Sequence, residues 1–362
     1  MQVFDQMRGH EQVVFGNDDD AGLRCIIAIH STALGPALGG TRFRPYDSDD
    51  AALADVLALS EAMSLKNAMA GLDHGGGKAV IIGDPATLRS EALLRAYGRM
   101  IASLGGRYIS ACDVGTGPAD MEVIRRETRW VTGMSPAAGG SGDSGVLTAF
   151  GVEVGMKAAA RHRWGSHDLT DRHVVVQGLG KVGGRLAASL LEQGATVTVA
   201  DVDDHAVATA VAAGATAVGV DEVVGVTADI LSPNALGGVL DPDTVAGLHV
   251  EIVCGGANNQ LTAPGVADDL AARDILYAPD YVVNAGGVIA VSDELHPQGH
   301  SPQRCRDRAK GIADTLAAVF ATADADGVST EVAARRLARQ RIDSAGQSPE
   351  PVGSSSPSVS SK

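Results

Sequence analysis

Aromatic residues and positive charge are both scarce in this chain of 362 residues. Phe, Trp and Tyr make up 3% of the sequence, and 44 acidic residues outnumber 29 lysines and arginines, which gives a formal net charge of −15. Proteins that bind single-stranded nucleic acid stack bases on aromatic side chains, and proteins that bind a phosphate backbone present a basic face. The composition therefore predicts no nucleic-acid partner, and the acidic surface favours solubility.

Cysteines are few and widely spaced, and long apolar runs are missing. Cys25, Cys112, Cys254 and Cys305 form no C-x-x-C pair, and none stands at zinc-ligand spacing from a histidine. We expect buried free thiols, a reducing compartment and no bound metal. No run approaches the ~18 apolar residues of a membrane span, and the N-terminal stretch lacks the apolar core of a signal peptide. These features predict a cytoplasmic protein without a membrane partner.

Glycine, by contrast, is abundant, at 45 of 362 residues. It follows no G-X-Y period, which excludes a collagen-like chain, so tight turns and close backbone contacts explain it better. The sequence has no G-x-S-x-G motif, which excludes a serine hydrolase with that nucleophile turn. The length predicts two domains of roughly 150 residues each.

The first domain, expected at residues 1–146, mixes strands and helices. Apolar runs predict strands at 25–30, 78–82 and 107–112. Ala/Leu-rich stretches with helical spacing predict helices at 50–70 and 88–104. The glycine-rich stretch at 34–46 is assigned no regular element. A loop rich in Gly, Ser and Asp at 139–146 predicts a hinge.

The second domain, expected at 147–330, has a regular βαβ rhythm. Strand-like runs stand at 174–176, 196–200, 217–220, 229–231, 251–254 and 275–278. Apolar strands that alternate with helices indicate a parallel sheet covered on both faces, so the fold class is α/β. Closing helices are predicted at 303–325 and 329–343. In the division into domains, residues 331–344 are assigned to a C-terminal helix that follows the second domain. The Ser/Pro-rich segment 345–362 is predicted to be a disordered tail.

A dinucleotide site is predicted where the strand at 174–176 meets the next helix. The connecting residues are Gly178, Leu179, Gly180, Lys181, Val182 and Gly183, a G-x-G-x-x-G motif. Gly178 permits a tight turn, Gly180 lets the backbone approach a pyrophosphate, and Gly183 permits close packing of helix and strand. Asp201 ends the next strand, where its carboxylate can accept both ribose hydroxyls and repels a 2′-phosphate. The motif therefore predicts NAD rather than NADP.

Two lysines enclose a second glycine run, Gly75-Gly76-Gly77. Lys66 precedes the run and Lys78 follows it at the start of an apolar strand. The P-loop pattern does not fit, because Leu72 and Ala79 stand where it needs Gly and Ser or Thr. A partly buried lysine at such a position can act as a base, and its neighbour can pair with an anionic substrate. Two solvated surface lysines remain the alternative.

A loop with two acids follows the strand at 107–112. Asp113 and Asp120 bracket a Gly- and Pro-containing stretch, and catalytic carboxylates often follow strand ends. Simple turn chemistry is the alternative explanation, because Asp and Gly favour turns for conformational reasons.

Longer strings connect these sites to a known family. They are HEQVV at 10–14, AIHSTALGPALGGTRF at 28–43, KNAMAGLDHGGGKAVIIGDP at 66–85, SLGGRY at 103–108, CDVGT at 112–116, GANNQL at 256–261 and YAPDYVVNAGGVI at 277–289. On these strings the chain resembles the glutamate/leucine/phenylalanine/valine dehydrogenase superfamily, over about residues 10–345. The resemblance implies an N-terminal α/β substrate-binding and catalytic domain, a C-terminal Rossmann-type NAD-binding domain, a cleft between them, and a homo-oligomer, either dimer or octamer.

The resemblance also implies residue roles. Lys78 matches the catalytic lysine, Asp120 the acid that carries protons to and from the amine, and Asp113 a supporting acid. The substrate set comprises Lys66 for the carboxylate, Gly39 and Gly40 as a backbone wall, Asn258 and Asn284, and the apolar pocket residues Leu38, Ala111, Val288 and Val291. The cofactor set adds Thr148 and Asn258, at the nicotinamide, to the glycine motif and Asp201.

The implied reaction is the reversible, NAD-dependent oxidative deamination of a branched-chain L-amino acid such as valine to the 2-oxo acid, ammonia and NADH. An apolar pocket disfavours glutamate, because burial of its γ-carboxylate without a partner is costly. Leucine or phenylalanine as substrate stays open, since one methylene is worth only about 1–3 kcal/mol. A non-catalytic NAD-binding sensor on the same fold is a remote alternative.

Three places depart from the family pattern. His74 stands where an apolar residue is usual, Gly117-Pro118 alters the loop before Asp120, and Ser232-Pro233-Asn234 replaces a more familiar A-P-C. No departure removes a residue with a catalytic role. We expect them to affect rate and substrate preference rather than the class of reaction.

Overall fold

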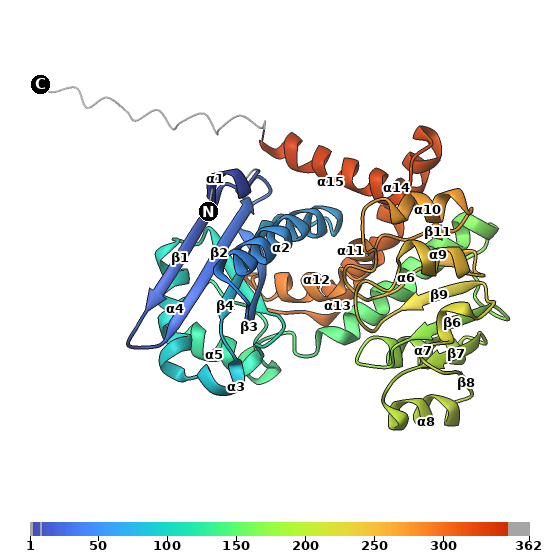
Figure 1. Ribbon diagram of the computed structural model, residues 1–362, viewed down its shortest axis with the longest axis horizontal. Coiled ribbons are helices and arrows are strands. Elements are labelled where there is room, and N and C mark those ends of the chain that lie inside the picture. The colour runs from blue at the N-terminus through green and yellow to red at the C-terminus, as the bar shows by residue number, and fades with distance from the viewer. Residues whose placement is uncertain (1–2, 8, 347–362) are drawn as a thin grey trace, which may run out of the picture.

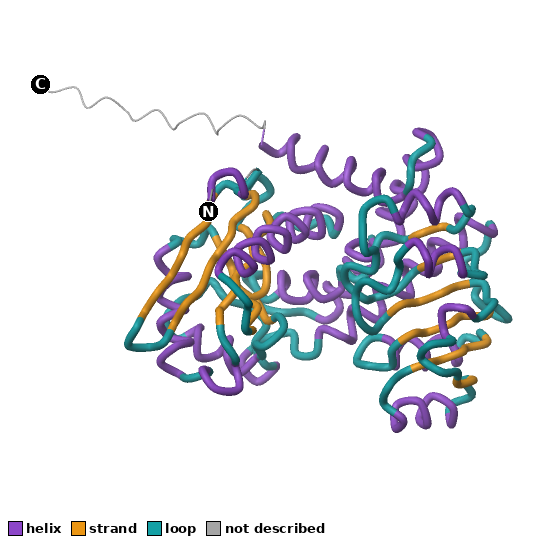
Figure 2. Tube along the Cα trace, in the orientation of Figure 1, coloured by secondary structure: helices purple, strands orange, loops and turns teal. Residues whose placement is uncertain are grey.

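The computed structural model describes residues 3–7 and 9–346. Two α/β lobes lie side by side, with helices between them (Figure 1). Figure 2 shows a separate sheet in each lobe. This arrangement confirms the predicted α/β class. The tail predicted at 345–362 lies outside the described residues from 347 onward, whereas residues 345 and 346 are the last two of a helix.

The first lobe is built on a mixed five-stranded sheet. Its strands are β1 (Gln12–Asp18), β2 (Leu23–Ser31), β3 (Ala37–Arg44), β4 (Gly75–Ile82) and β5 (Tyr108–Cys112). The strand order is β1-β2-β4-β3-β5. β2 pairs antiparallel with β1 and β4, whereas β3 runs parallel to both β4 and β5.

Strands β1 and β3 were not predicted. β3 contains Gly39 and Gly40, and glycine is a weak strand former. Hydrogen bonding to β4 on one side and β5 on the other makes β3 a strand despite its composition. β4 likewise begins at Gly75, so the glycine run that was expected to precede the strand forms its first three residues.

Helix α2 (Asp49–Met69) is the predicted helix at 50–70, and it carries Lys66 in its last turn. Ser48 caps its N-terminus, where Oγ accepts the N–H of Ala51 at 3.1 Å. α2 packs against β2 and β4 and also against the C-terminal helix. The other helices of this lobe are α1 (Val3–Gln6), α3 (Pro85–Leu88), α4 (Glu91–Ser103) and α5 (Pro118–Arg125).

The second lobe has the predicted parallel sheet. Its strands are β6 (His173–Gln177), β7 (Thr196–Ala200), β8 (Thr216–Ala217), β9 (Ile230–Pro233), β10 (Ile252–Val253) and β11 (Leu276–Tyr277), in the order β11-β10-β9-β6-β7-β8. All five pairings are parallel. The helices and 3₁₀ turns are η1 (Pro136–Ala138), α6 (Ser144–Trp164), α7 (Gly183–Glu192), α8 (Asp204–Ala212), η2 (Val223–Gly225), α9 (Pro242–Gly247) and α10 (Val266–Ala272).

The hinge loop predicted at 139–146 is shorter in the structure, because α6 begins at Ser144. Asp143 caps this helix, and its Oδ1 accepts the N–H of Gly145 at 3.0 Å. The connection between the lobes therefore ends at a capped helix, which gives the second lobe a defined start.

Five helices close the chain and lie partly between the lobes (Figure 1). They are α11 (Asp280–Val283), α12 (Gly286–Asp293), α13 (Pro302–Lys310), α14 (Ile312–Asp326) and α15 (Thr330–Gly346). The single helix predicted at 303–325 is two helices that meet at Gly311, a residue that weakens a helix interior. α15 packs against both α14 and α2, so it joins the two lobes.

One apolar cluster spans both lobes. It places Leu65 and Met69 of α2 with Val152 and Met156 of α6. All four cysteines are free, as predicted, although Cys112 is only partly buried. Burial raises the pKa of the Cys25 thiol to about 12. Within the described residues, no helix is long and apolar enough to cross a membrane.

Candidate active site

A cavity of about 1030 Å³ opens between the lobes and is lined by residues from both. It brings together most of the predicted site: Leu38, Gly39, Gly40, Lys66, Lys78, Ala111, Asp113, Thr148, Lys181, Val182, Asn258, Asn284, Val288 and Val291. The sequence positions of these residues differ by up to 253, from 38 to 291, so only the tertiary fold assembles them. Six predicted site residues are not among the lining residues: Asp120, Gly178, Leu179, Gly180, Gly183 and Asp201.

Lys78 and Asp113 form an ion pair inside the cavity. Lys78 lies in β4 and is 6% exposed, and its Nζ is 2.8 Å from Asp113 Oδ2. Arg42, from β3, places its Nε 3.1 Å from the same oxygen. Burial opposes ionisation of Asp113, but the neighbouring Lys78 and Arg42 outweigh it and lower the pKa of that carboxyl. Asp113 is therefore an ionised partner for Lys78.

Asp120 occupies a different place. It is the third residue of α5, and its Oδ2 accepts the N–H of Gly117 at 2.9 Å. Its Oδ1 lies 3.6 Å from Arg89 Nε. The side chain is buried and contacts the start of its own helix, where a carboxylate is a favourable cap. The structure thus brings Asp113, rather than Asp120, to Lys78.

Lys66 makes a polar contact across the cleft. Its Nζ donates to Asn258 Oδ1 at 2.9 Å, and Asn284 Nδ2 donates to the same oxygen at 2.9 Å. Burial and the nearby Lys78 lower the pKa of Lys66 to about 8, while Asp280 and Asp113 oppose that change. The three predicted substrate-binding residues Lys66, Asn258 and Asn284 are therefore one connected group.

Leu38, Ala111, Val288 and Val291 line an apolar section of the same cavity. Leu38 and Ala111 come from neighbouring strands, and the two valines come from α12. Gly39 stands beside them, and its carbonyl accepts the hydroxyl of Tyr108 at 2.7 Å. This arrangement matches an apolar pocket closed by a backbone wall.

The glycine motif has the geometry of a phosphate-binding turn. Gly178 adopts a φ of +92°, and a Cβ built on Gly183 would lie 1.9 Å from Gly178 O. A Cβ on Gly180 would meet nothing within 4 Å, so its backbone is open to a ligand. α7 begins at Gly183 and directs its N-terminus at this turn. The residues present therefore fit a dinucleotide.

Asp201 follows β7 at the expected distance from this turn. Its Oδ2 accepts the N–H of Leu179, and its Oδ1 accepts the N–H of Asp203 at 2.9 Å. These backbone hydrogen bonds outweigh partial burial and lower the pKa of Asp201. An oriented carboxylate beside the glycine turn is suited to ribose hydroxyls.

Arg42 and Glu294 contribute to the site and were not predicted. Arg42 Nη1 contacts both carboxylate oxygens of Asp55, at 3.1 and 3.0 Å, which fixes the guanidinium beside Asp113. Glu294 directly follows α12 and accepts the N–H groups of Gly133, at 2.8 Å, and Ser141, at 2.7 Å. Two sequence features could have identified these residues. Arg42 belongs to the GGTRF string, and Glu294 stands three residues after Val291, which is helical spacing.

Two of the three departures from the family pattern have structural explanations. Gly117-Pro118 begins α5, where proline at the first helical position is favourable. Asn234 Oδ1 accepts the N–H of Gly256 at 2.9 Å, which supports the GANNQ loop. His74 is partly buried, and its Nδ1 has no hydrogen-bond partner among the described residues. Nothing in the structure gives His74 a function.

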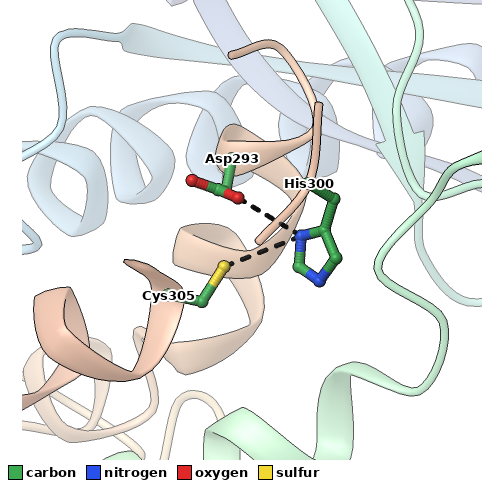
Figure 3. Close-up of side chains that lie close together, drawn as sticks. All are labelled: Asp293, His300 and Cys305. Atoms are coloured by element: carbon green, nitrogen blue, oxygen red, sulfur yellow. Dashed lines mark hydrogen bonds and ion pairs between the residues drawn. The ribbon is translucent and has the colours of Figure 1, made fainter. Parts of the chain in front are cut away.

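Asp293, His300 and Cys305 are a set of metal-type donors that lie together where α12 ends and α13 begins (Figure 3). His300 Nδ1 lies 3.4 Å from Asp293 Oδ2 and 3.7 Å from Cys305 Sγ. The same Asp293 oxygen already accepts Arg304 Nη2 at 2.8 Å and the N–H of Ser301 at 2.7 Å. A cation would have to displace the guanidinium, so we interpret the group as a clamp on the loop between α12 and α13.

A two-lobed α/β fold, a lysine–carboxylate pair in the cleft and a glycine turn whose Lys181 and Val182 line the same cavity define a dinucleotide-dependent dehydrogenase. Residues 10–130 match the family profile described as "Glu/Leu/Phe/Val dehydrogenase, dimerisation domain", and residues 200–348 match "Glutamate/Leucine/Phenylalanine/Valine dehydrogenase". The chain belongs to this family of amino-acid dehydrogenases.

Individual relatives match over almost the whole length. A valine dehydrogenase of Streptomyces virginiae is 58% identical over 93% of this chain and 95% of its own. A leucine dehydrogenase of Geobacillus stearothermophilus is 48% identical over 95% of this chain and 94% of its own. The crystal structure of an L-tryptophan dehydrogenase from Nostoc punctiforme superposes with a TM-score of 0.85 and 42% identity, over 95% of this chain and 100% of that one.

Proposed function

We propose that this protein catalyses the reversible, NAD-dependent oxidative deamination of L-valine and related branched-chain L-amino acids to the 2-oxo acid, ammonia and NADH. The observation that carries the proposal is the Lys78–Asp113 ion pair at 2.8 Å, in one cavity with Lys66 and an apolar pocket. Higher identity to valine dehydrogenases (57–58%) than to leucine dehydrogenases (45–48%) supports valine. The metabolic role that corresponds to this reaction is the degradation of branched-chain amino acids.

Substrate binding follows from charge and shape. Lys66 binds the α-carboxylate, and Asn258 and Asn284 orient the amine and the nicotinamide from the other side of the cleft. Gly39 and Gly40 lie along the substrate backbone. Thr148, in the first turns of α6, lines the cavity where the nicotinamide amide would be held.

The chemistry is assigned to Lys78 and Asp113. Bound NAD supplies the acceptor for a hydride from the substrate Cα. Lys78 activates the water that replaces the amine, and its Nζ holds a proton that Asp113 Oδ2 can exchange at 2.8 Å. The role first expected of Asp120 is therefore proposed for Asp113, because a proton relay needs contact with the reacting group. Asp120 is proposed to stabilise α5.

Substrate preference is proposed to depend on Leu38, Ala111, Val288 and Val291. All four are apolar, and they offer no cation to a glutamate γ-carboxylate. A branched aliphatic side chain gains favourable burial there. Leucine and phenylalanine differ from valine in volume, so the size of this pocket decides among them.

NAD is proposed over NADP because acids surround the ribose position. Asp201 stands beside the glycine turn, and Asp203 and Asp204 follow it. A 2′-phosphate would meet these negative charges, which disfavour its binding.

A cytoplasmic homo-oligomer, either a dimer or an octamer, is part of the proposal. The match of residues 10–130 to a profile described as a dimerisation domain supports self-association. β1 is an edge strand with Phe15 52% exposed, which is a surface that a second copy can cover. Four free thiols agree with a reducing compartment.

The test is the absorbance of NADH at alkaline pH, with NAD or NADP, for L-valine, L-leucine, L-phenylalanine and L-glutamate. We expect the highest kcat/KM with NAD and valine, no turnover of glutamate, and loss of activity in a Lys78→Ala variant. Binding of NAD without NADH formation from any of these amino acids would contradict the proposal and favour an NAD-binding sensor.

A further inference from the structure

Lys66 lacks a direct counter-ion in the cleft. Three lysines line the cavity, Lys66, Lys78 and Lys181, and Asp113 is the carboxylate that pairs with Lys78. Asp113 Oδ2 contacts Lys78 Nζ at 2.8 Å and Arg42 Nε at 3.1 Å. Within the part of the chain that the structure describes, Lys66 forms no ion pair, and its Nζ donates to the neutral amide of Asn258. Another source of negative charge is needed to keep it protonated.

Asp280 is placed to supply that charge. It is the first residue of α11, which packs against α2, the helix of Lys66. Asp280 is 7% exposed and lines the same cavity as Lys66. Burial raises the pKa of Asp280. The N–H of Gln260, which Asp280 Oδ2 accepts at 2.9 Å, and the nearby Lys66 act in the opposite sense and favour the ionised carboxylate.

The same turn of helix also reaches Lys66 through hydrogen bonds. Asn284 ends α11, and its N–H donates to the carbonyl of Asp280 at 2.9 Å. Asn284 Nδ2 then donates to Asn258 Oδ1, the oxygen that accepts Lys66 Nζ. α11 therefore presents one charged and one amide residue to the lysine of the opposite lobe.

We propose that Asp280 is a positioning residue that keeps Lys66 in its charged form, so that Lys66 can bind the carboxylate of the substrate. The inference rests on the proposed function, in which Lys66 has that task. Charge in a cleft of restricted solvent access acts over longer distances than in water, so Asp280 need not touch Lys66.

The other titratable groups that line the cavity do not supply this charge. Glu61 Oε1 of α2 lies 3.8 Å from Arg339 Nη2, and Asp143 Oδ2 lies 3.0 Å from Arg185 Nη2. Glu331 of α15 is committed to Arg335, with 2.6 Å between Oε1 and Nε. Burial raises the pKa of Tyr277 and Tyr281 far above the usual range, so both stay neutral. Lys78 of β4 acts in the opposite sense, because a second cation disfavours the charge on Lys66.

The titration of Lys66 supports the assignment. Burial lowers the pKa of Lys66 to about 8, and Asp280 is the strongest of the groups that raise it again. Removal of the Asp280 charge therefore lowers the pKa of Lys66 further. The pH above which the enzyme loses affinity for a carboxylate should fall accordingly.

The experiment uses the full chain with NAD and measures inhibition by isovalerate against L-valine from pH 7 to pH 10.5. Isovalerate carries the carboxylate and the branched chain but no amine, so it does not titrate in this range. An Asp280→Asn variant retains an acceptor for Gln260 and removes only the charge. We expect the alkaline loss of isovalerate affinity to begin roughly one pH unit lower in this variant.

Glu331→Gln is the matched control, because it removes a different buried carboxylate from the same cavity wall. Its isovalerate profile should superimpose on that of the unmutated enzyme. In Lys66→Arg the alkaline loss should disappear within the range, because arginine stays charged, and adding Asp280→Asn to it should then cause no shift.

If the isovalerate profile of the Asp280→Asn variant superimposes on that of the unmutated enzyme, the inference is overturned. The enzyme would still turn over amino acids in that case, so this outcome differs from failure of the proposed function. If the Asp280→Asn variant does not fold, Lys66→Arg decides: an alkaline loss that persists in it shows that Lys66 is not the titrating group and overturns the inference. The absence of turnover with every amino acid would instead refute the proposed function.

Discussion

Asp113 and Asp120 show how the same residue type acquires different tasks within one loop. Both follow β5, and both were candidate acids in the sequence. Asp113 turns into the cavity, where Lys78 and Arg42 hold its charge. Asp120 turns back onto Gly117 and begins a helix. The spacing of these residues along the chain cannot predict their different tasks, because the tasks depend on the direction in which each side chain leaves the backbone.

We therefore expect Asp113→Asn to lower kcat with L-valine by a factor on the order of 10² to 10⁴, the usual effect of removing a group that transfers a proton. Asp120→Asn should leave kcat close to the unmutated value, because its amide oxygen can still accept the N–H of Gly117. Steady-state kinetics on both purified variants checks this. The reverse result, with Asp120→Asn inactive, would return the proton-transfer role to Asp120.

At the scale of elements, α12 determines the pocket. It presents Val288 and Val291 to the cavity, and both of its ends are fixed. Gly286 packs so tightly against α6 that a Cβ there would lie 2.2 Å from Leu147 O. At the other end, Glu294 binds the backbone of Gly133 and Ser141. A rigid helix lets small differences in side-chain volume become differences in substrate preference.

Val291→Ala enlarges the pocket, and it should change the ratio of kcat/KM for leucine to that for valine by about tenfold in favour of leucine, since one methylene is worth roughly 1–3 kcal/mol. Ser292→Ala, on the same helix but outside the cavity lining, is the control and should leave the ratio unchanged. A parallel fall with both substrates in Val291→Ala would show instead that the helix, and not the pocket volume, was affected.

At the scale of the whole molecule, α15 joins the lobes. Ala333, Ala334 and Ala338 are 0% exposed, which lets the helix approach closely. Arg341 Nη1 donates to the carbonyl of Ala68 at 2.7 Å, and Arg341 Nη2 lies 3.3 Å from Asp73 Oδ1. These contacts reach the end of α2, the helix that carries Lys66. The C-terminal helix therefore supports the last turn of α2, in which Lys66 lies.

Deletion of residues 330–362 should lower the melting temperature and raise KM for L-valine, because it exposes the apolar surface under α15 and frees the end of α2. Deletion of residues 347–362 alone, which lie outside the described residues, is the control. Its Ser/Pro-rich composition predicts no loss of stability. Thermal unfolding and steady-state kinetics on both deletions test this. An unchanged melting temperature for the longer deletion would contradict the structural role of α15.

The helices and strands with regular apolar spacing were the ones that the sequence predicted best. The strands β6 and β7 and the helix α2 were predicted within a few residues, because apolar spacing directly reports a buried face. β3 was missed, since its glycines carry no such signal and its strand geometry comes from neighbours on both sides. The split at Gly311 was missed for a related reason, because apolar spacing continues on both sides of it.

The resemblance to a family supplied the apolar pocket, whereas the sequence by itself determined the class of fold, the dinucleotide turn and the pair of lysines. Each of these depends on residue type and short spacing, which local physical chemistry interprets. Only the tertiary structure decided that Asp113 meets Lys78, that Arg42 supports it, and that Lys66 donates to Asn258 in a cavity that Asp280 also lines. Those contacts join segments up to about 200 residues apart, and their distances depend on how strands and helices pack rather than on the order of residues.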